Sequence, residues 1–204
     1  MTKQLCSRKG ILMAVIFAGL LIPRHSMAQS TDEETNDIPD QMPAKHHKKK
    51  LPEPVYPKTV GYLSFIIPTG TLQNNKVTYN FTNNTKIGFP CGVNVFYSAH
   101  FGFSYEVTPT IKTTTLSGNT SMSDLLFDPG PMFRFSHGFT IIPRLSFETS
   151  GRYGVTPVFN EVYLRTKSVN YFVAMSLPCR WGADNGVMQT GSIGLNVQFG
   201  FIFN

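Results

Sequence analysis

Charged residues are scarce in this sequence, at 15% of 204 residues, and only three cysteines are present. Soluble domains usually carry a quarter or more charged residues on their surface. No Cys-x-x-Cys or Cys/His spacing is present, so the usual zinc and redox motifs are excluded and we expect no metal, cofactor or redox centre. The chain is instead rich in Phe, Tyr, Gly, Asn and Thr, a composition that favours strands and turns over long helices.

Long hydrophobic runs are also lacking. The longest, Ile11–Ile22, is too short and badly flanked for a membrane-spanning helix. It follows three basic residues within the first nine and precedes small residues at Ser26 and Ala28. This order is typical of a secretory signal, so we predict a signal peptide over 1–28 that is cleaved between Ala28 and Gln29.

A basic surface is not implied by the formal charge of +6. Four of the eighteen Lys and Arg residues lie in the predicted signal, which leaves 14 basic against 12 acidic residues. Nucleic-acid binding needs a clustered basic face, and we therefore expect no nucleic-acid partner.

Residues 29–56 begin with five acids over 32–40, continue with a Lys/His run over 45–50, and contain several prolines. Few of these residues can bury apolar area, so we predict a disordered periplasmic linker. The Lys/His run is interpreted as a solvated charge run; contact with anionic lipid headgroups or weak metal binding are the alternatives.

From residue 57 onward the apolar residues recur with a period of two, and the final run shows this most clearly. Apolar residues fall on one face of it, with Ser192, Gly194, Asn196, Gln198 and Gly200 on the other. Alternate residues of a strand point to opposite faces. One face of this strand therefore requires an apolar medium. Its apolar residues are Ile193, Leu195, Val197, Phe199, Phe201 and Phe203.

The same alternation predicts seven further strands, of which the first and the sixth alternate least cleanly. Their connections alternate between short turns, near 98–100, 136–138 and 165–167, and longer polar loops, near 69–85, 112–123 and 182–191, with a tighter loop near 150–154. This pattern is typical of bacterial outer-membrane barrels. We predict an all-β, eight-stranded, antiparallel up-and-down transmembrane β-barrel over 57–204, with short periplasmic turns and longer outer loops. The seven strands cover about 59–67, 87–98, 101–111, 125–135, 139–149, 155–164 and 168–181.

An alternating sheet also fits a soluble barrel or sandwich with its apolar face inside. The charges favour the membrane interpretation, because three acids and three arginines fall opposite the apolar faces. An enclosed ion needs a partner, and arginine suits that role. We therefore expect a lumen charge network of Glu106, Asp128, Arg134, Arg144, Glu148 and Arg180.

Aromatic residues near the predicted strand ends suit the interfacial girdles of a membrane barrel. Six prolines in or near strands argue against a continuous ladder, because proline cannot donate to it. The six prolines are Pro90, Pro109, Pro129, Pro131, Pro143 and Pro178.

Cys91 and Cys179 are interpreted as unpaired side chains on strand faces, and a disulfide is the alternative.

The signal, the alternating strands and the Phe-rich final run over 191–203 resemble small Gram-negative outer-membrane β-barrel proteins, of the OmpA/OmpW-like or PorT-like group. The segment 169–178, an Asn-Tyr followed by Pro, looks like a strand of that group. The resemblance implies that Phe203 acts as an insertion signal for the barrel assembly machinery, although Asn204 follows it. Outer-membrane lipids, lipopolysaccharide and other envelope proteins are the partners that it implies.

We expect a structural or interaction role without catalysis, because an eight-stranded barrel has an interior just wide enough for side chains. A narrow, porin-like pore or carrier for small, hydrophobic molecules is the main alternative, since several inward glycines leave space. A lipid hydrolase would need a Ser-His-acid set, and His100 and His137 both fall in short turns. A soluble periplasmic ligand-binding barrel is the fourth hypothesis.

Overall fold

The computed structural model describes residues 55–114 and 117–203, all in the second of two units into which the chain divides, residues 51–204. The predicted signal, its cleavage site at Ala28 and Gln29, and the linker up to residue 54 lie outside the described residues. Within them the protein is all-β, and every strand pair is antiparallel, which confirms the predicted class.

Twelve strands and one single-turn 3-10 helix form the described part of the chain. No helix there has the length and hydropathy needed to cross a membrane. The elements are β1 (Lys58–Gln73), β2 (Lys76–Tyr79), β3 (Asn84–Gly88), β4 (Cys91–Phe96), β5 (Phe101–Thr114), β6 (Thr120–Phe127), β7 (Gly130–Arg134), η1 (Ser136–Gly138), β8 (Phe139–Glu148), β9 (Arg152–Arg165), β10 (Val169–Ser176), β11 (Cys179–Asp184) and β12 (Val187–Phe203).

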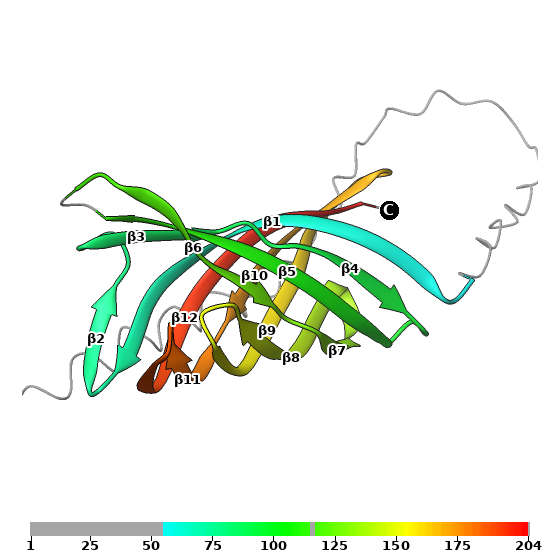
Figure 1. Ribbon diagram of the computed structural model, residues 1–204. Coiled ribbons are helices and arrows are strands. Elements are labelled where there is room, and N and C mark those ends of the chain that lie inside the picture. Colours follow the sequence, from blue (N-terminus) through cyan, green and yellow to red (C-terminus); the bar gives the residue numbers. More distant parts are fainter. Residues whose placement is uncertain (1–54, 115–116, 204) are drawn as a thin grey trace, which may run out of the picture. The chain divides into compact units, whose positions relative to one another are not determined.

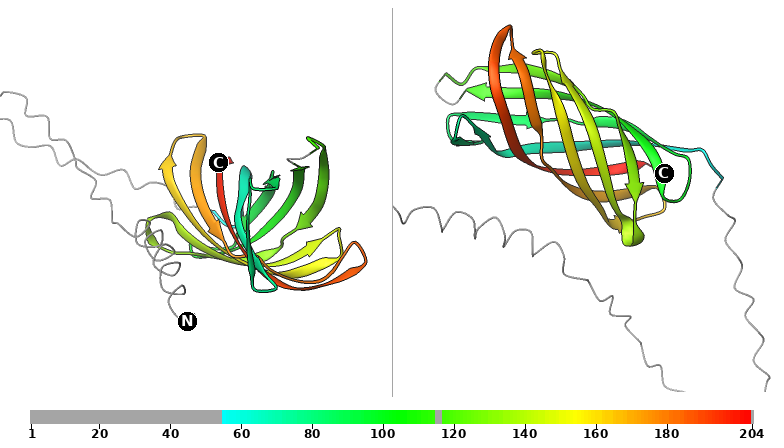
Figure 2. Two further views of the ribbon diagram at one scale, coloured as in Figure 1. Left: turned by 90° about the vertical axis from the view of Figure 1, so that its left-hand side faces the viewer. Right: turned by 90° about the horizontal axis from the view of Figure 1, so that it is seen from below.

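The strand pairings form a closed ring. β1 pairs with β12 from Gly61 opposite Phe203 to Gln73 opposite Ser192, so the first and last strands of the described chain lie side by side (Figure 1). Between them the order is β3 with β4, then β5, β6 with β7, β8, β9, and β10 with β11. Figure 2 shows these strands running side by side on a common slant.

The strand number differs from the eight predicted because prolines divide three of the predicted strands. The breaks between β3 and β4, β6 and β7, and β10 and β11 each contain a proline, which has no N–H for the ladder. The carbonyl oxygens still take part, so the two halves remain in one row of the ring. Pro90, Pro129 and Pro178 accept hydrogen bonds from the backbone N–H groups of Ser64, Leu145 and Gly194, at 2.9, 2.8 and 2.8 Å.

Dividing three of the eight predicted strands gives eleven. The remaining additional strand, β2, comes from a segment that was predicted as a loop. The polar stretches at 69–85, 112–123 and 182–191 are mostly strand, which corrects that prediction. β1 turns through Asn74-Asn75 into β2, and β11 turns through Asn185-Gly186 into β12. These residues have φ values of 51°, 57°, 51° and 83°, as in the two-residue turns that suit the twist of hairpins. The many polar residues of these stretches led to the loop prediction, although Leu72, Val77 and Tyr79 of the β1–β2 hairpin share one face.

The other end of the ring carries short connections: 97–100, the segment containing η1, and 166–168. β1 begins at this end, since Lys58 lies opposite Phe96. We call it the short-turn end.

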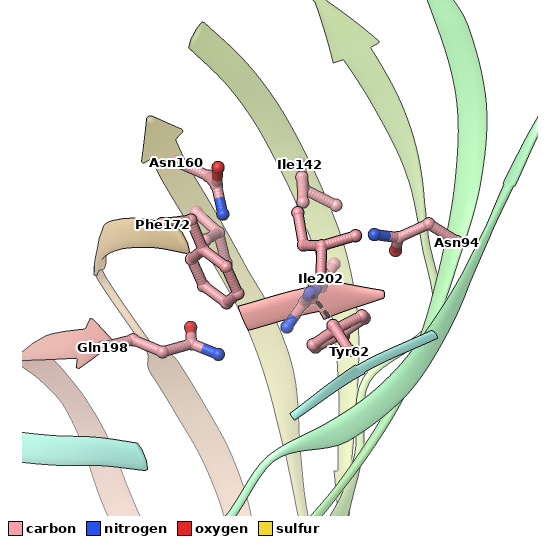
Figure 3. Close-up of a pocket in the computed structure, with 9 residues that line it drawn as sticks. Tyr62, Asn94, Ile142, Asn160, Phe172, Gln198 and Ile202 are labelled. Atoms are coloured by element: carbon pink, nitrogen blue, oxygen red, sulfur yellow. Dashed lines mark hydrogen bonds between the residues drawn. The ribbon is translucent and has the colours of Figure 1, made fainter. Parts of the chain in front are cut away.

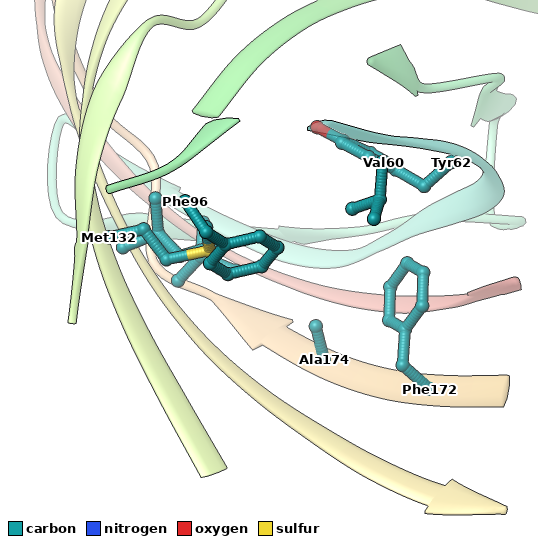
Figure 4. Packing of buried hydrophobic residues seen from close by; sticks show 8 residues of the cluster. Val60, Tyr62, Phe96, Met132, Phe172 and Ala174 are labelled. Carbon is teal, nitrogen blue, oxygen red and sulfur yellow. The ribbon is translucent and has the colours of Figure 1, made fainter. Parts of the chain in front are cut away.

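Buried hydrophobic residues are few and lie inside the ring towards the short-turn end (Figure 4). Phe96 and Met132 lie together beside Gly102, while the rings of Tyr62 and Phe172 meet edge to face with centroids 6.2 Å apart. The rest of the enclosed space is occupied by polar side chains, which form the candidate site.

Candidate functional site

The two faces of the sheet have the opposite polarity to that of a soluble protein. Ser104 and Ser146 are fully buried, and the Glu106 carboxylate is only 2% exposed. On the other face, Phe65 is 49% and Leu145 is 55% exposed. Period-two alternation sends successive residues to opposite faces, so each strand contributes polar side chains to the inside and apolar ones to the outside.

The centre of the enclosed face is an ion pair between β5 and β8. Arg144 Nη1 lies 2.6 Å from Glu106 Oε1, and both side chains are buried. Arg144 Nη2 donates to the hydroxyl of Tyr62 at 3.0 Å and to that of Ser104 at 3.2 Å. The Tyr62 hydroxyl in turn donates to Glu106 Oε2 at 2.7 Å. We call Tyr62, Glu106 and Arg144 the central triad.

The triad joins opposite sides of the ring. Tyr62 is on β1 and Arg144 is on β8, with three rows of strands between them in either direction. A fourth row, after those of β1, β5 and β8, contributes Gln198 of β12, whose side-chain amide donates to Ser64 at 2.8 Å. Thr108 of β5 donates to Glu106 at 3.2 Å. Hydrogen bonds between side chains therefore cross the whole width of the enclosed space.

A second cluster of polar side chains lies nearer the end of the ring that carries the β1–β2 and β11–β12 hairpins, opposite the short-turn end. Arg180 Nε lies 2.7 Å from Glu148 Oε1, and Arg180 Nη1 donates to Thr156 at 2.8 Å. Arg152 Nη2 donates to Ser192 at 2.7 Å. Arg152 was not predicted, because it was assigned to a tight loop that is in fact the start of β9.

Two of the six predicted network residues do not pair with an opposite charge among the described residues. Asp128 is buried between β6 and β7, and its Oδ1 has no hydrogen-bond partner there. The Arg134 guanidinium lies over the ring of Phe96, 4.7 Å from its centroid. The structure thus brings four of the six residues into two ion pairs. The alternation placed these four residues on the enclosed face but did not predict which of them would form ion pairs with each other.

Tyr62 is the member of the central triad that sequence reasoning missed. The first strand carries apolar Val60 and Tyr62 at positions that face inward, so its alternation is blurred. Tyr62 lies two residues before Ser64, so the two-residue repeat places both on the same, polar face. A buried tyrosine hydroxyl usually has a hydrogen-bond partner. The position of Tyr62 in this repeat was therefore the signal in the sequence that could have identified it.

The cavity beside the triad is small, about 20 Å³, and Figure 3 shows the side chains that surround it. Asn94 and Asn160 line it together with Ile142 and Ile202. The same four residues also line a larger cavity of about 350 Å³ at the short-turn end.

The predicted lipid-facing residues of β12 lie on its outer face. Ile193, Phe199 and Phe203 are exposed, and Leu195, Val197 and Phe201 are partly buried by neighbouring side chains. Cys91 and Cys179 are both free thiols.

His137 lies in η1 and His100 in the turn after β4, where its Nδ1 is 3.3 Å from the carbonyl oxygen of Arg134. Neither has an acid and a hydroxyl arranged around it in the described contacts. The part of the chain that the structure describes holds no group of three or more residues suited to a metal ion.

No protein-family model and no curated protein matches this sequence. Among solved structures, the chain is similar to the outer membrane protein OprG from Pseudomonas aeruginosa, with 8% identity and a TM-score of 0.30. That match covers 71% of this chain and 93% of the other. A likeness at this TM-score does not establish a shared fold.

Proposed function

We propose that this protein is an integral outer-membrane β-barrel with a closed lumen and a structural or interaction role in a Gram-negative cell envelope. One observation carries the proposal: ionised side chains are buried inside a ring of strands whose outer surface is apolar. Soluble monomers rarely expose apolar patches larger than a few hundred Å². Here exposed Phe, Tyr and Leu side chains occur on nearly every strand of the ring, so the surface requires an apolar solvent.

Strand pairing supports the same proposal. A segment that crosses a bilayer must satisfy its backbone groups internally, and a closed sheet does so without free edges. The ring contains eight rows of strands once the halves divided by proline are joined. Bacterial barrels have an even number of strands, short periplasmic turns and longer outer connections. By that rule we assign the short-turn end to the periplasm, and the long hairpins β1–β2 and β11–β12, at the opposite end, to the outer side.

The central triad supports a closed lumen. Arg144 and Tyr62 meet across the ring, and Gln198 and Thr108 occupy the remaining width. We therefore expect little solute flow, which favours the interaction role over the narrow pore or carrier. The outer connections, the lipids and lipopolysaccharide around the apolar surface, and neighbouring envelope proteins are the proposed contacts. Phe203 is the proposed insertion signal for the barrel assembly machinery.

Heat-modifiable gel migration of the membrane fraction tests the barrel. Folded barrels resist SDS until boiled, because a closed sheet leaves few backbone groups unpaired. We expect faster migration before boiling than after it. Recovery of the protein in the soluble periplasm without detergent, or identical mobility in both lanes, contradicts the proposal.

Planar-bilayer recording tests the closed lumen separately. Purified protein is expected to give a flat baseline. Unitary conductance steps would favour the narrow pore, while leaving the barrel itself in place.

A further inference from the structure

The larger cavity, of about 350 Å³, lies at the short-turn end. Asn94, Ile142 and Asn160 line both this cavity and the smaller one beside the central triad. Pockets for small molecules usually measure roughly 300–1,000 Å³. The cavity therefore has the size of a small-molecule pocket.

Three cations line this cavity, and no acidic residue does. They are Lys58 at the start of β1, Arg134 at the end of β7 and Arg165 at the end of β9. Within the described ranges none of the three forms a salt bridge, whereas Arg144 and Arg180 both do. The positive charge of Lys58, Arg134 and Arg165 is thus not neutralised by the other residues that line the cavity.

The two arginines are held by their surroundings. The Arg134 guanidinium lies over the Phe96 ring, which leaves its N–H edge directed away from that ring. A Cβ atom at Gly138 would lie 2.7 Å from Arg165 Nη2, so the Arg165 guanidinium rests against the bare backbone of η1. Planar guanidinium groups bind carboxylates and phosphates through paired hydrogen bonds.

Apolar side chains form much of the wall below the cations. Val60, Met132 and Ile142 are buried, and Val162 and Ile202 are partly buried beside them. Figure 4 shows Val60, Phe96 and Met132 among these residues. Such a wall favours a hydrocarbon group, because apolar surface removed from water contributes roughly 25 cal/mol per Å².

We propose that this cavity is a binding site for a small amphiphilic anion, with its acidic head at Arg134 and Arg165 and its hydrocarbon part against Met132 and Val162. The site goes beyond the proposed structural role. It depends on the geometry of the short-turn end and not on which membrane, if any, surrounds the protein.

Methyl NMR of the full protein in a neutral maltoside detergent, with ¹³C-methyl methionine, tests the site. Octanoate is the probe, octanol supplies the same chain without charge, and acetate supplies the head alone. We expect octanoate to shift the Met132 methyl signal saturably, with octanol and acetate at least about tenfold weaker, as expected from the loss of charge-assisted hydrogen bonds or of apolar contact. Met175, on the outer face of β10, reports partition into the micelle.

Matched variants identify the head-group contacts. Arg134→Gln and Arg165→Gln are each expected to weaken octanoate binding about tenfold, the effect of losing one charge-assisted hydrogen bond. Lys76→Gln, on exposed β2, removes a cation outside the cavity and should leave binding unchanged. Each variant is first checked for heat-modifiable migration, and Arg134→Lys replaces Arg134→Gln if the latter does not fold.

Three results overturn the site: no Met132 shift with octanoate, octanol binding as tightly as octanoate, or equal shifts at Met132 and Met175. Failure of this site leaves the barrel proposal intact, because gel migration and fractionation test that proposal without any ligand.

Discussion

The guanidinium of Arg144 and the carboxylate of Glu106 meet at 2.6 Å inside the ring, with both side chains almost wholly removed from solvent. Desolvation of two ions costs several kcal/mol each, and their attraction offsets this only when further hydrogen bonds are present. Tyr62, Ser104 and Thr108 provide those bonds. The burial of the Arg144 guanidinium and that of the Glu106 carboxylate are therefore each stable only in the presence of the other ion.

Removing one partner of this pair is expected to be severe. Glu106→Gln should lower the free energy of unfolding by about 3–5 kcal/mol, because Arg144 is left buried without its counter-charge. The double variant Glu106→Gln/Arg144→Met should regain most of the loss. Urea unfolding followed by the fluorescence of Trp181, the single tryptophan, measures both.

The matched control is the pair Lys86–Asp124 near the surface, with side chains 44% and 15% exposed and charged atoms 3.9 Å apart. Lys86→Met should change stability by no more than about 1 kcal/mol. A loss at Glu106 no larger than this would show that the central triad does not hold the ring together.

An arginine on the outer face distinguishes lipid from water as the solvent of that face. Leu145 lies within β8 and is 55% exposed. In a bilayer, Leu145→Arg should cost roughly 2–4 kcal/mol near the midplane, and Val187→Arg, beside the β11–β12 turn, only about 0–1 kcal/mol. Urea titrations of protein refolded into vesicles give the two values.

On a water-exposed surface the substitution at Leu145 would fall within about 0.5 kcal/mol of neutral. Equal and small effects at both positions would therefore contradict the membrane assignment.

Cys91 provides a chemical test of the same surface. Its thiol is exposed on the outer face, where β4 pairs with β1 and β5. In a Cys179→Ser background, we expect slow reaction with a charged, membrane-impermeant maleimide and fast reaction with an apolar one, because lipid excludes the charged reagent. A cysteine introduced at Ser117, between β5 and β6, should react with both. Equal rates at Cys91 would indicate that water covers this face.

Close approach of strands explains one glycine of β9. A Cβ atom at Gly154 would lie 1.9 Å from the carbonyl oxygen of Cys179 on the paired strand β11. Gly154→Ala should destabilise the protein by about 1–3 kcal/mol, as overpacking does, with the loss measured by urea unfolding. Gly61→Ala is the control, because its nearest contacts would be 4.0 Å away. Similar stability of the two variants would contradict the close contact of β9 and β11.

For most strands, the side that faces inward follows from the sequence alone, because the two-residue repeat is a local property of extended backbone. It placed Glu106, Arg144 and Arg180 on the enclosed face, and Leu145 and Phe199 on the other. Hairpins such as β1–β2 escaped it because their segments were interpreted as polar loops, although Leu72, Val77 and Tyr79 share one face and the Asn185-Gly186 turn signal was present. Proline at 90, 129 and 178 was visible in the sequence, but its effect on strand number was not.

Which charges meet depends on the tertiary structure. Ring closure sets the stagger between strands, and that stagger brings Arg144 of β8 to Glu106 of β5 and to Tyr62 of β1 across the enclosed space. It leaves Asp128 and Arg134 without a salt bridge among the described residues. It also creates the cavity whose cations come from β1, β7 and β9. Contacts between residues about 80 positions apart depend on the whole ring, and no local pattern records them.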